Sequence, residues 1–273
     1  MEETKVKKAN IELHNVEAQF YDQVHFEIFN EAEQKYVAEK LSKLWTELKV
    51  RKSCLDLGCG TGNISKKERK FFAQVIGLDL SKAMLLQFKE KTELQDISLS
   101  CGDCENLPFK DNTFDFISMY STLHHLPHPV LALREMFRTL KAGGVIYIGH
   151  EPNALKYRLF LNPILSIFSI LGQFVTKKSS KYPSLILLQK KLGPLTDIQV
   201  RDGFSSRSIK TTLETIGFSN VCVEFHVFFQ FVFAALPRPF NRLVKLDHLF
   251  EKNKIIAPLC STIIITAKKD CLI

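Results

Sequence analysis

The feature that most constrains the fold is the run CLDLGCGTGN at residues 54–63, in which a short apolar segment breaks into glycines at every second position. Glycine tolerates positive φ and lets a ligand approach the main chain closely. A buried strand that turns directly into a helix also brings backbone N–H groups and the positive end of the helix dipole to one place. The run therefore predicts a strand, a tight turn and a helix start that together form a ligand site.

The spacing of these glycines excludes one common kind of ligand site. A dinucleotide-binding turn has glycines at relative positions one, three and six. Counting from Gly58, the third glycine would stand at position 63, which is Asn63. Counting from Gly60, it would stand at position 65, which is Ser65. The turn is therefore predicted to hold a ligand without a pyrophosphate group.

Short apolar runs and helical patterns alternate along most of the chain. The expected strands are 53–57, 74–80, 97–101, 114–119, 144–149, 221–231 and 261–267. The expected helices are 17–49, a helix from 61 onward, 81–91, 129–140 and 205–216, with a turn at 141–144. This alternation is typical of an α/β domain with a parallel sheet.

A chain of 273 residues with 45% hydrophobic residues can bury one large core. We expect one domain, with an N-terminal helical cap at 1–50, a core formed by 51–151 and 203–273, and an apolar helical lid inserted at 152–202. Seven cysteines without a framework spacing, and an N-terminus without an apolar signal core, favour a reducing, cytoplasmic compartment.

The formal net charge of +8 would suit an anionic partner such as nucleic acid or a membrane face. Charge alone does not decide between these partners and an ordinary basic enzyme. Cys101 and Cys104 form a single CxxC pair, which lacks the further ligands of a tetrahedral zinc site. We therefore expect no metal.

The glycines at 58, 60 and 62 behind the run LDL resemble motif I of the class I S-adenosylmethionine-dependent methyltransferases. Further segments resemble that family in the same order along the chain: VIGLD, CGDCENLPF, NTFDFISM, LREMFRTLKAGGV and LETIGFSNVCV. The resemblance implies a Rossmann-like α/β fold, with a seven-stranded, mostly parallel sheet, one antiparallel strand and helices on both faces. It also implies S-adenosyl-L-methionine as the methyl donor.

The resemblance assigns cofactor roles to several positions. Asp79 would accept both ribose hydroxyls, because two carboxylate oxygens match a vicinal diol, and Asp103 would accept from the adenine amino group. The residues expected to bind the cofactor are Tyr21, Asp56, Gly58, Cys59, Gly60, Gly62, Asp79, Leu80, Asp103, Cys104 and Tyr120. The alternatives are that the turn is only a tight connection, and that Asp79 caps the helix beginning near Ser81.

Methyl transfer is an in-line displacement, so a general base is needed only for a hydroxyl or carbon-acid acceptor. The candidates for a catalytic base are His124 and His125, after the fourth strand, and His150 of the pair His150-Glu151 at the end of the fifth strand. The alternative for this pair is that it fixes the loop. Each of these histidines has the alternative of a local packing or hydrogen-bonding role. Tyr21 and His25 either wall the active site or pack the N-terminal helix.

The inserted run NPILSIFSILGQFV at 162–175 predicts a helix with one narrow polar seam and basic residues on both sides. It is too short to span a bilayer cleanly, so it either lies in a membrane interface, making 153–181 a peripheral contact, or forms a buried lid helix. Both alternatives favour a hydrophobic small-molecule or lipid-like acceptor, methylated at oxygen or carbon. The other functions considered are RNA methylation and a non-catalytic, cofactor-binding scaffold, and a nucleic-acid partner is not favoured.

Overall fold

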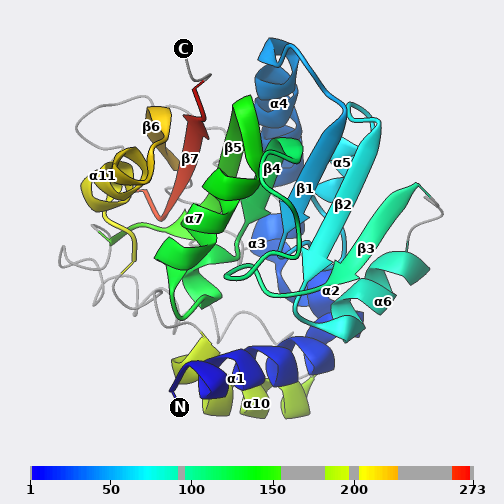
Figure 1. Cartoon of the computed structure of the whole chain (residues 1–273). Coiled ribbons are helices and arrows are strands. Elements are labelled where there is room, and N and C mark those ends of the chain that lie inside the picture. Colours follow the sequence, from blue (N-terminus) through cyan, green and yellow to red (C-terminus); the bar gives the residue numbers. More distant parts are fainter. Residues whose placement is uncertain (1, 92–95, 155–181, 197–202, 227–259, 271–273) are drawn as a thin grey trace.

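The computed structural model describes residues 2–91, 96–154, 182–196, 203–226 and 260–270. Its centre is a seven-stranded sheet with the order β3-β2-β1-β4-β5-β7-β6 (Figure 1). The strands are β1 (Ser53–Leu57), β2 (Gln74–Asp79), β3 (Ile97–Cys101), β4 (Phe114–Tyr120), β5 (Leu140–Pro152), β6 (Ser219–His226) and β7 (Thr262–Lys268). Only β7 among them runs antiparallel to its neighbours, β5 and β6. The predicted fold class is confirmed.

Helices cover both faces of this sheet (Figure 1). The N-terminal helices are α1 (Glu2–Glu17), η1 (Ala18–Phe20), α2 (Tyr21–Val24), α3 (Phe26–Phe29) and α4 (Glu31–Glu47). The later helices are α5 (Ser65–Glu68), α6 (Lys82–Glu90), η2 (Leu123–His125), α7 (Pro129–Thr139), α10 (Pro183–Thr196) and α11 (Ser206–Ile216). The core on one face contains residues of α7 and α11, and the core on the other face contains residues of α4.

The strand β1 shows why the sheet is buried on both sides. All five of its residues are buried. Leu55 and Leu57 belong to the core on the α7 face, whereas Cys54, which precedes Leu55, belongs to the core on the α4 face. Side chains of a strand alternate between faces, so a continuous apolar run places a parallel strand between two helical layers.

Local signals account for several helix ends. Asn30 is the N-cap of α4, where its side chain accepts from the Glu33 N–H at 3.0 Å. In α4, Val37, Leu41 and Trp45 recur every four residues and are buried. At the other end of the chain α11 stops at Gly217, whose φ of 119° is the left-handed conformation expected at a helix C-terminus.

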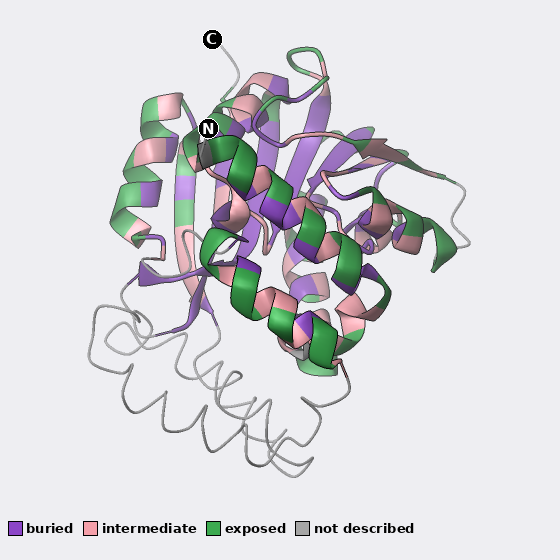
Figure 2. Ribbon diagram, turned by 90° about the horizontal axis from the view of Figure 1, so that it is seen from below, coloured by how far each residue is buried: buried purple, intermediate pink, exposed green. Residues whose placement is uncertain are grey.

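The helix α1 was not predicted, and it lies beside α10 across the lower end of the molecule (Figures 1 and 2). Its buried residues include Ala9 and Leu13, which pack with Leu185 and Leu192 of α10. The segment expected as one helix at 17–49 is divided into η1, α2, α3 and α4. The cap is thus a bent series of helices.

Two predicted boundaries were wrong. The helix expected from 61 begins only at Ser65, because Gly60 and Gly62 hold the preceding turn at φ values of 52° and 89°. The turn expected at 141–144 lies within β5. There Gly143 donates to the Lys269 carbonyl at 2.7 Å, so residues after β7 extend the pairing. Most of the expected insertion, residues 155–181, and the end of the expected strand, 227–231, lie outside the described residues.

Candidate functional site

A cavity that is partly open to solvent lies where β1 to β4 end at their carboxyl edges. Parallel sheets hold their ligands at this edge. The cavity brings together eight predicted site residues: Tyr21, Gly58, Gly60, Asp79, Leu80, Asp103, Cys104 and His125. Its lining does not include six others: Asp56, Cys59, Gly62, Tyr120, His124 and His150. Four lining residues from α1 were not predicted: Lys7, Asn10, Ile11 and His14.

The glycine turn forms the floor of this cavity, and its three glycines are of two kinds. Gly58 has a φ of 67°, and a Cβ there would lie 2.3 Å from the Thr122 hydroxyl. A Cβ at Gly62 would lie 2.4 Å from the Phe88 ring. Gly60, with a φ of 52°, faces open space, with no atom within 4 Å of its Cβ position. Gly58 and Gly62 are therefore required for packing, whereas Gly60 leaves room for a ligand at the main chain.

Asp79 stands at the end of β2 beside this turn. Its Oδ2 accepts from the Gly60 N–H at 2.9 Å and its Oδ1 accepts from the Ser81 N–H at 2.8 Å. The N-cap of α6 is Ser81, whose hydroxyl accepts from the Met84 N–H at 3.2 Å, so Asp79 is not the capping residue. Each oxygen of Asp79 keeps a lone pair. Burial raises the pKa of this carboxyl, against the effect of its two N–H donors.

Asp103 is already engaged by a lysine from α1. Lys7 Nζ lies 2.7 Å from Asp103 Oδ2, 2.7 Å from Glu105 Oε2 and 2.6 Å from Glu3 Oε1. Burial disfavours the charged ammonium, but hydrogen bonds to Asp103 and Glu105 outweigh it and raise the pKa of Lys7. Lys7 therefore bridges three carboxyls beside the cavity and offsets part of their charge.

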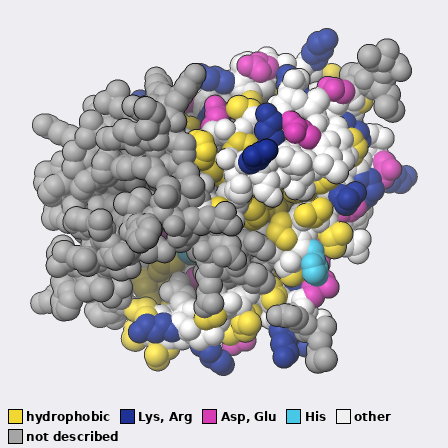
Figure 3. Space-filling model, turned by 90° about the vertical axis from the view of Figure 1, so that its left-hand side faces the viewer, with side chains coloured by type: hydrophobic (Ala, Val, Ile, Leu, Met, Phe, Trp, Pro, Cys, Tyr) yellow, Lys and Arg dark blue, Asp and Glu magenta, His cyan; other side chains and the backbone are white. Residues whose placement is uncertain are grey.

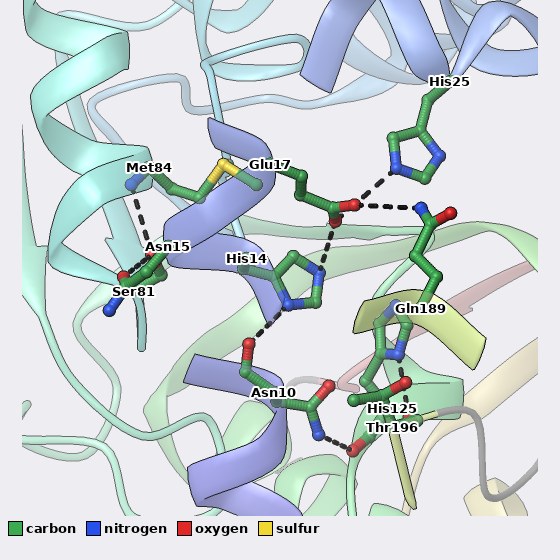
Figure 4. A network of polar contacts seen from close by, with 12 residues as sticks. Asn10, His14, Asn15, Glu17, His25, Ser81, Met84, His125, Gln189 and Thr196 are labelled. Atoms are coloured by element: carbon green, nitrogen blue, oxygen red, sulfur yellow. Dashed lines mark hydrogen bonds and ion pairs between the residues drawn. The ribbon is translucent and has the colours of Figure 1, made fainter. Parts of the chain in front are cut away.

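Two further polar side chains of α1 continue along the same face of the helix (Figure 4). The Asn10 amide Nδ2 donates to the Val6 carbonyl at 3.1 Å and to the His125 carbonyl at 3.2 Å. His14 Nδ1 lies 2.8 Å from the Asn10 carbonyl, and the His14 ring meets the His125 ring edge-on at 5.2 Å. Burial, together with neighbouring His125, lowers the pKa of His14. Together with Lys7, these residues make α1 the roof of the cavity.

Three of the predicted site residues instead support the turn from behind. Asp56 is buried and accepts from the Ser65 N–H at 2.9 Å and from the Ser118 hydroxyl at 3.2 Å. Burial raises the pKa of Asp56 to about 6. Cys59 points toward Gly77, where a Cβ would lie 2.9 Å from its sulfur, and Gly62 packs on α6. These contacts hold the turn against the sheet.

The two histidines of η2 differ in their surroundings. His124 is held by Glu151, with Nδ1 and Oε2 2.9 Å apart. The Glu151 carboxyl also accepts from the N–H groups of Thr122, Leu123 and His124 at 2.9, 2.9 and 3.1 Å. Glu151 therefore orders the loop after β4, which agrees with the alternative role of fixing the loop. His125 lines the cavity, and its Nδ1 lies 3.0 Å from the Thr196 carbonyl.

A second group of polar side chains lies where β4 and β5 end, beside α3 and α4. His150 is buried and has a φ of 57°, a conformation that costs a non-glycine residue energy and is enriched at functional sites. Its ring lies 5.5 Å from that of Tyr120. Burial lowers the pKa of His150, against the nearby carboxyls of Glu33 and Glu27. The imidazole is thus kept neutral and able to accept a proton.

Glu33 connects this group to β6. The Tyr120 hydroxyl donates to Glu33 Oε1 at 2.6 Å, and His226 Nε2 lies 2.8 Å from Glu33 Oε2. Tyr36 stacks on the His226 ring at 4.0 Å with an interplanar angle of 10°. Sequence reasoning missed Glu33, because only the fold brings α4, β4 and β6 to one place.

His25 joins the two regions. Its Nδ1 lies 3.1 Å from Glu27 Oε1, and its Nε2 lies 3.6 Å from Glu17 Oε1, which also faces His14 (Figure 4). Burial disfavours its charged form, but the ion pairs with Glu17 and Glu27 raise the pKa of His25 to about 9. His25 is therefore an imidazolium at neutral pH. The Tyr21 ring lies 4.2 Å from it and separates it from the cavity.

Comparison with known proteins gives three findings. The family model described as a methyltransferase domain matches residues 55–148. The demethylmenaquinone methyltransferase of Staphylococcus haemolyticus is 31% identical over 184 residues, which are 59% of this chain and 75% of that protein. The demethylmenaquinone methyltransferase of Staphylococcus aureus (strain MRSA252) is 34% identical over 184 residues, which again are 59% of this chain and 75% of that protein.

A solved structure of an S-adenosylmethionine-dependent methyltransferase from Mesorhizobium loti agrees in fold. Its TM-score to this chain is 0.52 at 16% identity, and the match covers 85% of this chain and 98% of the other. The matched segment of the family model contains the glycine turn and the ends of β2, β3 and β4, which line the cavity. It begins after α1, so the roof lies outside it.

Proposed function

The chain belongs to the class I S-adenosylmethionine-dependent methyltransferases, and from this premise we propose that its acceptor is a hydrophobic, quinone-like molecule methylated at a ring carbon or oxygen. The observation that carries the proposal is the similarity to demethylmenaquinone methyltransferases over 75% of their length. The apolar run at 162–175 supports it, although these residues lie outside the described part of the chain.

The cavity fits the cofactor of this family. Gly60 leaves the main chain accessible, and Asp79 keeps one lone pair on each oxygen for two hydroxyl groups. We propose that Asp79 holds the ribose and that Asp103, at the opposite end of the lining, takes the adenine amino group. When bound, S-adenosylmethionine supplies a methyl group made electrophilic by its sulfonium. The chain's own contribution is to align the acceptor and exclude water.

We propose that His150 accepts the proton that a hydroquinone or similar acceptor must lose. Burial keeps its imidazole neutral at pH 7, and the carboxyls of Glu33 and Glu27 offset part of the cost of forming the imidazolium. His124 has a less suitable environment, because Glu151 holds its ring to the loop. His125 contacts the Thr196 carbonyl and belongs to the cofactor cavity.

The charges visible on one face of the described residues give no support to an RNA acceptor. On the face shown in Figure 3, the basic side chains of the described residues lie among acidic and apolar ones and do not form one continuous patch. An RNA-binding surface would gather them near the mouth of the cavity. Within the described part of the chain, no helix is long and apolar enough to cross a membrane. We propose that residues 153–181, most of which lie outside the described residues, make a peripheral contact with the membrane.

The test is a turnover assay with purified protein, S-adenosylmethionine and a short-chain naphthoquinone lacking one ring methyl group, supplied either oxidised or reduced. We expect S-adenosylhomocysteine and methylated product only from the reduced form, because an electron-rich ring is the nucleophile. His150→Gln should lower kcat at least tenfold while leaving cofactor affinity unchanged. His128→Gln, at an exposed histidine outside the cavity lining, is the control.

Other outcomes would replace parts of the proposal. Turnover with RNA but with neither the quinol nor a lipid extract would make the acceptor a nucleic acid. Binding of cofactor without turnover in either assay would favour a scaffold. Full activity of His150→Gln would exclude this histidine as the base.

A further inference from the structure

One buried acceptor atom in the roof has no hydrogen-bond partner. Asn10 is 8% exposed, and its Oδ1 accepts no hydrogen bond from the described residues. Buried polar atoms in proteins are nearly always paired, so an unpaired one on a residue that lines a cavity points to a ligand as its partner. Asn10 is also one of the residues that line the cavity.

The hydrogen bonds of the Asn10 amide nitrogen determine the orientation of the amide group. The Nδ2 group donates to two carbonyl oxygens, those of Val6 at 3.1 Å and His125 at 3.2 Å. Turning the amide over would place Oδ1 against both carbonyls and lose both hydrogen bonds. The nitrogen therefore faces the protein, and the oxygen is the atom left for a ligand that donates an N–H or O–H group.

The position of Asn10 identifies which part of the cofactor can supply this donor. Asn10 lies one helical turn after Lys7, which binds Asp103, and one turn before His14, on which the charge of Asp79 acts. It thus lies between the carboxyl proposed for the adenine amino group and the one proposed for the ribose. The donors between them are the amino group of the base and the ribose hydroxyls, and both belong to the adenosine portion.

We propose that Asn10 Oδ1 accepts a hydrogen bond from the adenosine portion of the bound cofactor, so that α1 forms part of the cofactor site. The same side chain then joins three parts of the molecule: α1, the cofactor and the loop that contains His125. The neighbouring α10 holds α1 in this position through the packing of Leu13 with Leu185 and Leu192.

The test measures equilibrium binding of S-adenosylhomocysteine to the full chain by calorimetry, without turnover. Asn10→Ala should weaken binding about tenfold or more. Glu12→Ala, at an exposed site on the same helix, is the matched control and should bind as the wild type does. Unfolding of each variant without ligand is measured in parallel, because Asn10 also anchors α1 to the His125 carbonyl.

Ligand analogues separate a binding role from an anchoring role. The inosine analogue of S-adenosylhomocysteine lacks the amino group, and the 2′-deoxy and 3′-deoxy analogues each lack one hydroxyl. For the analogue that lacks the true donor, the wild type should lose affinity and Asn10→Ala should lose much less, which is the coupling expected of a direct contact. The analogue that shows this coupling identifies the donor.

Two results would overturn the proposal. One is equal affinity of Asn10→Ala and wild type for S-adenosylhomocysteine. The other is weaker binding of all ligands by the same factor, which would assign Asn10 only to anchoring α1. Failure of the wild type itself to bind S-adenosylhomocysteine would instead contradict the premise that the cavity holds this cofactor, so the two failures are distinguishable.

Discussion

The floor and the roof of the cavity are built by different means. In the floor, the turn after β1 uses main-chain conformation: positive φ at Gly58, Gly60 and Gly62, and an N–H of Gly60 donated to Asp79. In the roof, α1 uses side chains that reach across the cavity, among them Lys7 bound to carboxyls at its far side. The site therefore combines a floor that is fixed by backbone sterics with a roof that depends on charge and pH.

The largest effect is expected from Gly58→Ala in the floor. The new Cβ would lie 2.3 Å from the stiff, β-branched Thr122 side chain and would stand at a positive φ of 67°. Overpacking and left-handed strain together should lower the free energy of unfolding by about 3 to 4 kcal/mol. Urea denaturation measures it. Gly60→Ala is the control, because it has the strain without the clash and should cost only about 1 kcal/mol. Equal costs would show that packing against Thr122 is unimportant.

The next effect concerns His25, behind the roof, and depends on pH. Its folded pKa of about 9 lies above the ordinary value of 6.5, so the folded state retains the proton longer than the unfolded state. The stabilisation is complete below pH 6.5 and is lost as pH rises through 9. Relative to His25→Gln, the wild type should lose up to about 3 kcal/mol of unfolding free energy over that range. Parallel curves for both proteins would contradict the ion pairs with Glu17 and Glu27.

The third prediction concerns Asp79, the side chain through which the floor is proposed to bind the ribose, and the change is Asp79→Ala. Loss of hydrogen bonds from a carboxylate to the ligand should weaken S-adenosylhomocysteine binding by about 2 kcal/mol, or roughly 30-fold. Calorimetry measures the change, and Asp96→Ala, at an exposed carboxyl before β3, serves as the control. Unchanged affinity would remove Asp79 from the ribose site.

The smallest effect is expected from Lys7→Met in the roof. The change removes the ammonium from Asp103, Glu105 and Glu3 but keeps the length of the side chain. Because Lys7 is partly exposed, the loss in unfolding free energy should be about 1 kcal/mol. The difference from wild type should shrink in high salt, which screens such pairs. A difference that does not change with salt would indicate packing instead of charge.

The floor of the cavity could be predicted from the sequence, whereas the roof could not. The bounds of β1 and β3 agree with their predictions, and the glycine spacing located the floor, because backbone requirements leave a local signature. The roof was missed. The face of α1 that carries Lys7, Asn10 and His14 is recognisable as a binding face only once α10, distant in sequence, is known to cover its apolar side.

The same limit applies to the roles of individual residues within a motif. His150 and Glu151 were considered as a pair, but adjacent side chains of a strand point to opposite faces, and Glu151 binds the loop after β4. Asp56 was expected at the cofactor; it lies outside the cavity lining and accepts hydrogen bonds from Ser65 and Ser118. A motif therefore marks which segment forms the site without separating the residues that touch the ligand from those that hold the segment in place.

The Glu151 carboxyl has a consequence for what this enzyme can recognise. Successive backbone N–H groups in a short loop form the kind of concave receptor that in other proteins captures a phosphate. Here three of them already bind a carboxyl group supplied by the chain itself, and His124 takes up its remaining acceptor capacity. The receptor is permanently self-liganded. The loop is therefore held in place by the chain's own carboxyl, and these three N–H groups are not available to bind a phosphate of a ligand.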